Sequence, residues 1–253
     1  IVLDRLNSYG IPHRLKFAPD PATTNRGNIG GAIGNNSCGS HSIVYGKTID
    51  HVMELETVLS DGSVVTMKEL NQEEFNAKCQ LASLEGEIYR GAYSIAENHS
   101  DDIDNRYPKI LRRVSGYNLD EMLKSPINLA KLIVGSEGTL ATITKAKVRL
   151  VRRPGSTALA VIHFDTMIEA MEATVLLLGE NPSAIELLDS TIVKQGKSHL
   201  SVARRMGFVE GSPAALLVVE VAGESPAETV SKAQNILDAT RKHRLGYHTL
   251  LIT

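Results

Sequence analysis

The sequence contains no tryptophan, and aromatic residues make up only 4% of its 253 positions. Proteins that bind single-stranded nucleic acid stack bases on aromatic side chains, so this scarcity argues against such a role. The sequence also lacks an excess of either charge, because it has 27 basic and 29 acidic residues and a formal net charge of −2. This near balance argues against nucleic acid or an anionic membrane surface as the main partner.

Cysteine and long apolar runs are scarce as well. Cys38 and Cys79 are the two cysteines, and neither lies in a spacing typical of a metal site. Two cysteines cannot build a disulfide framework, so we expect a reducing, cytoplasmic compartment. No run of about 18 apolar residues is present, so we expect no membrane span. The first ten residues lack the basic and apolar regions of a signal peptide.

Both ends of the sequence are unusual. It opens on Ile1, and its last residues, LGYHTLLIT, stop inside an apolar run, so we expect a fragment of a longer polypeptide. The length fits one large or two medium domains at about 100–200 residues each. The segment Arg152-Arg153-Pro154-Gly155 interrupts the apolar pattern. We therefore predict two domains, residues 1–152 and 153–253.

The first domain is predicted to combine helices with an antiparallel sheet. Its first ten residues indicate a helix that stops at Gly10. Two apolar runs flank Ser60-Asp61-Gly62, a strong hairpin signal. Residues 72–104 predict two or three helices, and residues 139–151 predict a turn that enters a long strand.

The second domain shows clearer periodicity. Strand, helix and strand patterns follow one another twice, which predicts a ferredoxin-like fold. Asp165 is the predicted cap of the first helix, in which Ile168, Met171, Val175 and Leu178 keep helical spacing and indicate ordinary amphipathic packing. The fold class of the whole chain is therefore α+β.

Two stretches are rich in glycine. NIGGAIGNNSCGS, residues 28–40, holds four glycines, three asparagines and two serines, and GSEGT follows at residues 135–139. Glycine permits positive φ and close backbone approach, so such a stretch is typical either of a tight turn or of a site that binds an anionic cofactor through N–H groups. A P-loop is excluded because the sequence has no G-x-x-x-x-G-K-[ST].

Three segments carry a resemblance to a known family. They are FAPDPATTNRGNIGGAIGNNSCGSHSIVYGKTIDHV, NRYPKILRRVSGYNLD and LIVGSEGTLATITKAKVRLV. In this order they resemble the FAD-linked oxidases, whose FAD-binding fold is called PCMH-type or vanillyl-alcohol-oxidase-type. The nearest branch is that of the D-2-hydroxyacid dehydrogenases, which act on D-lactate or D-2-hydroxyglutarate. The form RRVSGYNLDEML is most similar to large members fused to an iron–sulfur domain.

The resemblance implies a specific domain assignment. Residues 1–152 would be the C-terminal half of a PCMH-type FAD-binding domain, with an antiparallel sheet and helices. Residues 153–253 would be the first part of the family's C-terminal domain, a truncated ferredoxin-like cap on the substrate side. The other FAD half-domain and the family's metal-assisted active site would lie outside this sequence. Catalytic residues therefore stay unassigned, no metal ligand is expected, and we expect the isolated chain to hold FAD weakly and to be inactive.

The resemblance also implies the cofactor contacts. Glycines let the backbone approach FAD, asparagines and serines can bond its ribose hydroxyls or the polar edge of the flavin, and Glu137 should point away from the pyrophosphate, which would repel it. Some of these residues have a second interpretation, because Pro19 also stiffens a loop and Tyr45 also suits a core. The implied contacts are Pro19, Asp20, Thr23, Gly30, Gly31, Asn35, Asn36, Ser37, Gly39, Ser40, Tyr45, Gly46, Glu137, Gly138 and Ile143.

Arg112 and Arg113 are paired cations beside a glycine turn. Guanidinium groups bind carboxylates and phosphates, so either arginine is a candidate for the substrate, although surface arginines are common.

The function implied is the FAD-dependent oxidation of a D-2-hydroxyacid to the 2-oxoacid. Two alternatives stay open: an FAD-linked oxidase of another alcohol, and a cofactor-binding module that is inactive without further segments. The expected partners are a small hydroxyacid and an unknown electron acceptor. Peripheral association with a membrane through that acceptor is also left open. An iron–sulfur cluster outside this chain and a homo-oligomer are also left open.

Overall fold

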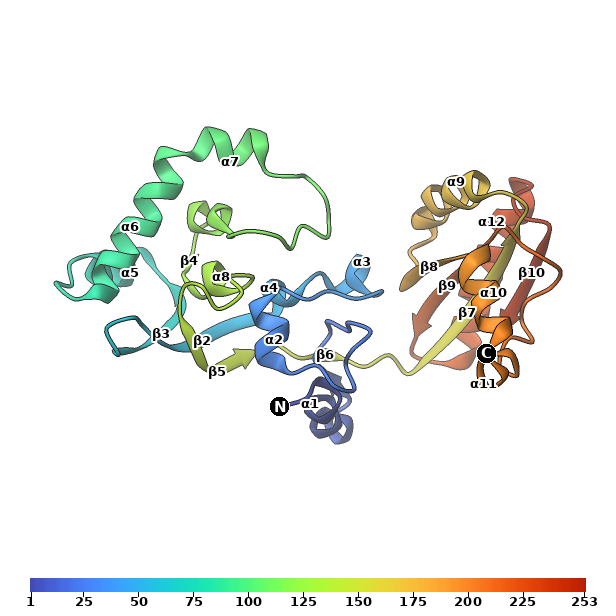
Figure 1. The fold of residues 1–253 in the computed structure, drawn as a ribbon, viewed down its shortest axis with the longest axis horizontal. Helices are drawn as coiled ribbons and strands as arrows, with labels where there is room; N and C mark the ends of the chain where they lie inside the picture. The colour runs from blue at the N-terminus through green and yellow to red at the C-terminus, as the bar shows by residue number, and fades with distance from the viewer. The chain divides into compact units, whose positions relative to one another are not determined.

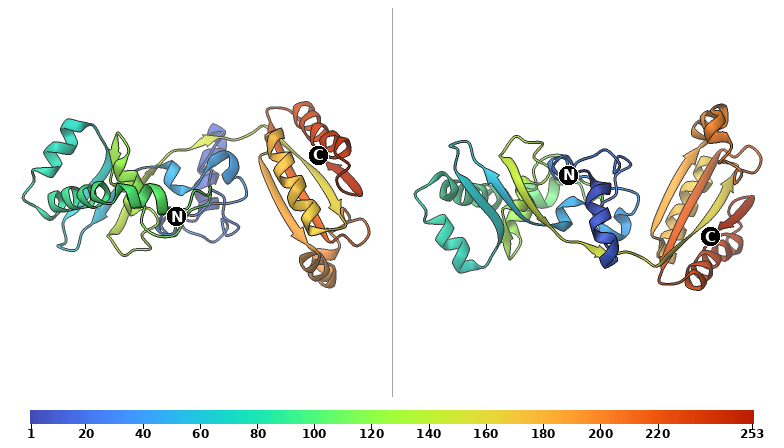
Figure 2. Two further views of the ribbon diagram at one scale, coloured as in Figure 1. Left: turned by 90° about the horizontal axis from the view of Figure 1, so that it is seen from above. Right: turned by 90° about the horizontal axis from the view of Figure 1, so that it is seen from below.

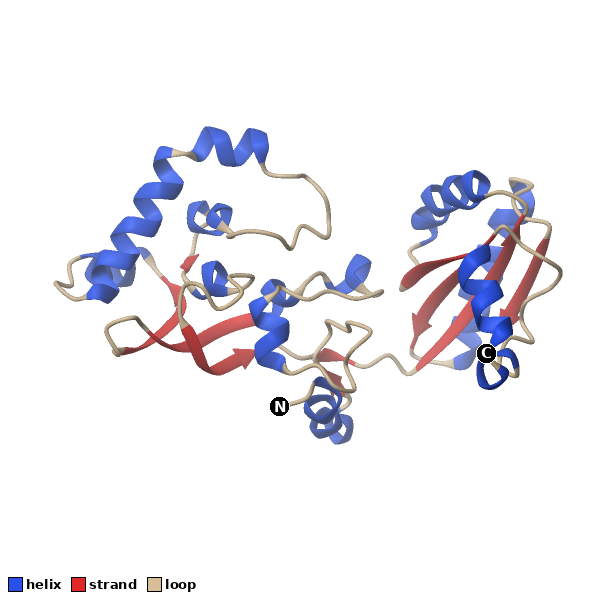
Figure 3. Cartoon of the chain, in the orientation of Figure 1, coloured by secondary structure: helices blue, strands red, loops and turns tan.

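The computed structural model describes residues 1–253, which divide into two compact units, Ile1–Arg152 and Arg153–Thr253 (Figure 1). Each unit has a four-stranded sheet, and the first unit has an additional two-stranded one. Both units combine helices with antiparallel sheets (Figure 3), which confirms the predicted α+β class. None of the helices is both long and apolar enough to cross a membrane.

The first unit has a sheet of order β4-β3-β2-β5, with every neighbouring pair antiparallel. Strands β1 and β6 pair separately. The strands are β1 Leu15–Lys16, β2 Val52–Val58, β3 Val64–Leu70, β4 Ile127–Asn128, β5 Thr142–Val148 and β6 Val151–Arg152. The helices are α1 Leu3–Gly10, α2 Ile29–Gly34, α3 Ser42–Tyr45, α4 Thr48–His51, α5 Gln72–Cys79, α6 Leu84–Asn98, α7 Ser100–Arg106 and α8 Ala130–Ile133, with 3₁₀ turns η1 Ile11–His13 and η2 Leu119–Leu123.

The predicted hairpin is confirmed between β2 and β3. Gly62 takes a φ of 84°, and the backbone N–H of Ser63 donates to Asp61 Oδ1 at 2.9 Å. These local bonds set the register that pairs Val58 with Val64. The strand predicted over residues 139–151 is shorter, because β5 begins only at Thr142 and breaks after Val148.

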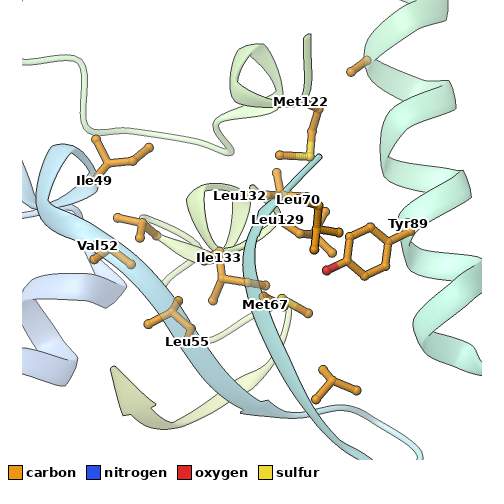
Figure 4. Close-up of a cluster of buried hydrophobic side chains, with 14 of the residues drawn as sticks. Ile49, Val52, Leu55, Met67, Leu70, Tyr89, Met122, Leu129, Leu132 and Ile133 are labelled. Carbon is orange, nitrogen blue, oxygen red and sulfur yellow. The ribbon is translucent and has the colours of Figure 1, made fainter. Parts of the chain in front are cut away.

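Three helices occupy the predicted span 72–104. The first begins with a capping box, in which Glu74 N–H donates to Asn71 Oδ1 and Asn71 N–H donates to Glu74 Oε2, both at 2.9 Å. The core of the unit lies between these helices and the sheet (Figure 4). Leu55, Met67 and Tyr89 are among its fully buried side chains, and the Tyr89 hydroxyl has no hydrogen-bond partner.

The second unit has the strand order β10-β7-β9-β8, all antiparallel, which is the predicted ferredoxin-like arrangement (Figure 2). Ser225 caps α12 by accepting a hydrogen bond from Glu228 N–H, and Pro226 takes the first helical position. The elements are β7 Ser156–Phe164, α9 Met167–Leu177, η3 Leu178–Glu180, β8 Ala184–Asp189, α10 Ser190–Ser198, α11 Leu200–Ala203, β9 Ala215–Gly223, α12 Pro226–Lys242 and β10 His248–Ile252.

The sheet of the second unit is covered on both faces. Along β7, Ala160 and Ile162 belong to the core shared with α9 and α12. Val161, between them, belongs to a smaller cluster with Val193 of α10. This alternation follows from the two-residue period of a strand and explains why β7 reads as an almost continuous apolar run.

Helix α9 differs from its prediction in two ways. Its cap is Thr166, whose hydroxyl accepts from Glu169 N–H, rather than Asp165. The residues expected to pack are exposed instead, by 69% at Ile168, 56% at Met171, 75% at Val175 and 46% at Leu178. The helix turns Ala170, Ala173 and Leu177 to the core, because small alanines let its backbone lie close to the sheet.

His163 of β7 gives a testable pH dependence. The ring is fully buried, Nε2 accepts from Glu210 N–H at 3.0 Å, and Nδ1 has no partner. Burial, reinforced by neighbouring His248, lowers the pKa of His163 below its ordinary value of 6.5. The unfolded chain therefore takes up a proton first, so stability is complete above about pH 6.5 and falls below it. We expect the urea midpoint to fall from pH 7 to pH 5.5, and to fall less in His163→Gln; an equal fall in both proteins would contradict this.

Candidate functional site

The first glycine stretch begins as a short helix rather than the tightly wrapped loop that its composition suggested. Gly30, Gly31 and Gly34 lie within α2, which Ala32 and Ile33 anchor by burial. A Cβ added at any of the three glycines would meet no atom within 4 Å. These glycines therefore leave a bare stretch of backbone that a ligand can approach closely.

The chain turns sharply after α2, at Asn36. This residue has a φ of 51° and is fully buried. Its Oδ1 accepts a hydrogen bond from Ile49 N–H at 2.9 Å, whereas its Nδ2 has no partner. Asparagine tolerates the left-handed region better than other residues with a side chain. Because Asn36 also lines a pocket, this unpartnered donor is a candidate to bind a ligand there.

The second glycine motif docks against the end of α2. Gly135 N–H donates to Ile33 O and Glu137 N–H donates to Gly34 O, both at 2.9 Å. Gly135 and Glu137 have φ values of 84° and 54°, so the turn depends on left-handed backbone at both positions. Two glycine-rich motifs a hundred residues apart in sequence are thus held together by backbone hydrogen bonds.

A pocket of about 590 Å³ opens where these segments meet. It brings together five of the predicted cofactor contacts: Thr23, Asn35, Asn36, Ser37 and Glu137. The rest of its lining is Pro21, Cys38, Val114, Ser115, Gly116 and Gly135.

The lining from Val114 to Gly116 was missed from the sequence, where the neighbouring arginines were singled out instead. The sequence feature that could have indicated this segment is Gly116, since a glycine suits a turn with positive φ, and its φ is 77°. No lysine or arginine lines the pocket, and Glu137 is its one carboxylate. A phosphate bound there would be met by N–H and O–H groups rather than by cationic side chains.

A second group of predicted cofactor contacts, Pro19, Asp20, Gly39 and Ser40, packs two loops together beside the pocket. A Cβ on Gly39 would overlap the carbonyl oxygen and Oδ1 of Asp20. The other oxygen of Asp20 forms an ion pair with His41 Nδ1, from which Ser40 Oγ lies 3.5 Å away. Pro19 is buried beside them. These contacts show a role in packing two loops together, and direct cofactor contact by these residues stays a prediction.

The remaining predicted contacts lie elsewhere in the unit. The Lys16 ammonium sits 4.7 Å from the centre of the Tyr45 ring. Gly46 has a φ of 71°, and a Cβ there would overlap the Asp50 carboxylate. Ile143 packs on the main core from β5, and Gly138 follows Glu137 with a φ of 75°. The structure gives each of them a local structural role outside the lining of the pocket.

Arg112 and Arg113 do not line the pocket either. Arg112 Nε donates to Ser42 Oγ at 2.8 Å. Arg113 forms an ion pair with Asp120 at 2.7 Å and stacks over the Tyr107 ring at 4.7 Å. Both guanidinium groups hold the loop that contains them, and substrate binding by either one stays a prediction.

The donor set fits FAD, the cofactor implied by the resemblance. The unpartnered Nδ2 of Asn36 and the hydroxyl of Thr23 are neutral donors suited to a pyrophosphate and its ribose. The Ser37 hydroxyl already donates to Asn35 Oδ1 at 2.5 Å, so it can only accept from a ligand. The bare backbone of Gly30 and Gly31 lies outside the lining of the pocket. Glu137 can accept hydrogen bonds from ribose hydroxyls. The residues present are therefore consistent with the dinucleotide.

Comparisons with known proteins agree with this chemistry. Residues 1–68 match the model of an FAD binding domain, and residues 153–249 match the C-terminal domain of FAD linked oxidases. The chain is 31% identical to a D-2-hydroxyglutarate dehydrogenase of Pseudomonas putida, over 98% of this chain and 26% of that protein. It is 28% identical to a D-lactate dehydrogenase of Archaeoglobus fulgidus, over 94% of this chain and 42% of that protein.

The solved structure of an alkyldihydroxyacetonephosphate synthase shares the fold, with a TM-score of 0.61 and 17% identity over 99% of this chain and 39% of the other. This chain spans about a quarter of the length of the D-2-hydroxyglutarate dehydrogenases that it matches. The first match lies in the first structural unit and the second match lies in the second unit. The chain belongs to the FAD-linked oxidase family.

Proposed function

We propose that this chain holds FAD within an oxidoreductase that converts a D-2-hydroxyacid, such as D-lactate or D-2-hydroxyglutarate, to its 2-oxoacid. The observation that carries the proposal is the convergence of Asn35–Cys38, Gly116, Gly135 and Glu137 on one pocket. The names of the relatives support the substrate class. When bound, FAD supplies the acceptor for the hydride that leaves the substrate carbon.

The residues of this chain divide the work of holding the cofactor. The bare backbone at Gly30 and Gly31 lets the cofactor approach α2, and Asn36 Nδ2 donates a hydrogen bond to it. The hydroxyls of Thr23 and Ser37 bind its polar groups, and the Glu137 carboxylate accepts from its ribose. The cysteine in the pocket is a free thiol, as is Cys79, in keeping with a reducing cytoplasm.

In this proposal the residues of this chain bind the cofactor and do not transfer a proton. The only titratable side chains in the pocket are Cys38 and Glu137, and neither has an oriented partner of the kind a general base needs. Residues 1–152 supply part of the FAD-binding domain, and residues 153–253 supply part of the C-terminal domain on the substrate side. The electron acceptor is not assigned to any residue of this chain.

Hydrogen exchange with and without about 1 mM FAD tests the location of the cofactor. Such a concentration populates a complex with a Kd of about 100 µM to about 90%. We expect slower exchange at amides 30–39 and 135–139, because bound FAD covers this backbone. Unchanged exchange at both segments would contradict the proposal, and slower exchange only elsewhere would move the cofactor to another surface.

Gly31→Ala separates cofactor binding from stability. An alanine in α2 should raise the free energy of unfolding by about 0.5–1 kcal/mol, because glycine is a poor helix former and the Cβ meets nothing. The same methyl group should weaken FAD binding about tenfold or more by blocking close approach. Gly91→Ala in α6 is the matched control, since its Cβ is also unobstructed. It should stabilise similarly and leave FAD binding unchanged, measured by flavin fluorescence titration.

A further inference from the structure

Helices α10 and α11 and the turn after them carry charge of one sign. Residues 190–209, which we call the basic segment, hold four of the 27 basic residues of the chain and none of its 29 acidic ones. The four cations are Lys194, Lys197, Arg204 and Arg205, and all four are exposed. The near balance of charge over the whole chain hides this local excess.

The cations of the basic segment have no carboxylate partner. Lys197 Nζ donates to the carbonyl oxygen of Gly211 at 3.2 Å, and the other three side chains form no hydrogen bond or ion pair. The cations of β5 differ, since Lys145 Nζ lies 2.9 Å from Glu56 Oε2 on the neighbouring strand. The positive charge of the basic segment is therefore left for a partner outside the chain to neutralise.

The basic segment also exposes apolar side chains beside its arginines. Leu200 is 71% exposed and Val202 is 44% exposed. Arg204 N–H donates to Leu200 O at 3.3 Å, and Arg205 N–H donates to Val202 O at 2.8 Å. Each bond spans about one helical turn, so each apolar side chain has an arginine on its own side of the turn.

The two helices of the basic segment form one surface. A Cβ on Gly196 of α10 would lie 2.6 Å from Met206 Sδ and 3.5 Å from Val202 Cγ1, so the chain after α10 folds back against it. Val193 and Met206 pack on the sheet below, on the face opposite α12 (Figure 1). The segment thus has a packed inner side and an outer side that combines cations with apolar groups.

An anionic lipid surface complements both features. Its phosphate groups attract lysine and arginine, and the boundary of its acyl chains accepts exposed apolar side chains. Nucleic acid would neutralise the same cations but would give Leu200 and Val202 no apolar surroundings. We propose that the basic segment is a docking surface for an anionic lipid bilayer, on which α10 and α11 rest without spanning it.

Flotation of the full chain with vesicles tests the proposal. We expect the chain to float with vesicles that contain about 30% phosphatidylglycerol in phosphatidylcholine, and to stay behind with phosphatidylcholine alone. Raising the salt from about 0.1 M to about 1 M shortens the Debye length from about 10 Å to about 3 Å, so it should release the chain. Absence of flotation with the anionic vesicles at low salt would overturn the proposal.

Charge reversal locates the surface. The double variant Arg204→Glu, Arg205→Glu should bind the anionic vesicles about 30-fold more weakly or worse, because each cation contributes about fivefold. Arg241→Glu, Lys242→Glu is the matched control, since it changes the net charge equally at exposed positions of α12. The control should bind like the unchanged chain, and equal losses in both double variants would refute a docking surface at the basic segment.

Leu200→Ser separates a lipid partner from a nucleic acid. It should weaken vesicle binding about fivefold or more, because leucine contributes only where an apolar boundary takes it up. Its side chain is 71% exposed, so the variant should fold normally. A labelled DNA duplex is the comparison ligand. If the unchanged chain bound the duplex more tightly than the vesicles, and Leu200→Ser weakened neither, the partner would be nucleic acid and the lipid proposal would be wrong.

Discussion

Gly39→Ala should destabilise the first unit by about 3 kcal/mol, the upper end of what overpacking costs. The added Cβ would overlap both the carbonyl oxygen and the carboxylate of Asp20, so a whole loop has to move. FAD binding should fall as well, because the displaced loop leads into Pro21 and Thr23 of the pocket. Urea unfolding measures the first effect, and flavin titration measures the second.

Gly34→Ala is the control for this substitution. It lies in the same glycine stretch, but its Cβ would meet no atom within 4 Å. We expect unchanged or slightly higher stability, by about 0.5–1 kcal/mol, from the better helix former. If Gly39→Ala were as stable as Gly34→Ala, the close packing of residue 39 on Asp20 would be disproved.

Asn36→Leu should cost about 2–5 kcal/mol of unfolding free energy, the sum of two local effects. Losing Oδ1 leaves the buried N–H of Ile49 without an acceptor, at about 1–3 kcal/mol. A leucine held at a φ of 51° adds about 1–2 kcal/mol of backbone strain. Thermal and urea unfolding measure the total.

Two further variants at this position divide the effect. Asn36→Gly avoids the backbone strain, but Ile49 N–H still lacks its acceptor. The stability of Asn36→Gly should therefore lie between that of Asn36→Leu and that of the unchanged chain. Asn36→Asp keeps an acceptor for Ile49 N–H and loses the Nδ2 donor, so it should reduce FAD affinity more than Asn36→Gly does, since its charge also repels the pyrophosphate. Full FAD affinity in Asn36→Asp would exclude Nδ2 as a cofactor donor.

Much of the fold could be predicted from local pattern. The hairpin at Asp61-Gly62, the helices over residues 72–104 and the ferredoxin-like order of the second unit all follow from signals within a few residues of each other. Turn chemistry, helix capping and the period of apolar residues act over such short distances, so the sequence expresses them directly.

The candidate site was predictable only in part. Composition singled out the two glycine motifs and the asparagines between them. It did not show that Gly30 and Gly31 lie in a helix with an open face, while Gly39 is packed against Asp20. The same residue type serves cofactor access at one position and loop packing at another, and the difference depends on which distant segment lies opposite.

Helix α9 shows most clearly where local pattern stops being sufficient. The spacing of Ile168, Met171, Val175 and Leu178 correctly predicts a helix and one shared side. The spacing does not show which side meets the sheet, because Ala170, Ala173 and Leu177 form a second apolar side that can also be buried. The sheet packs against the alanine-rich side, whose small side chains let the helix backbone lie close to the strands, and this packing exists only once strands and helix are assembled.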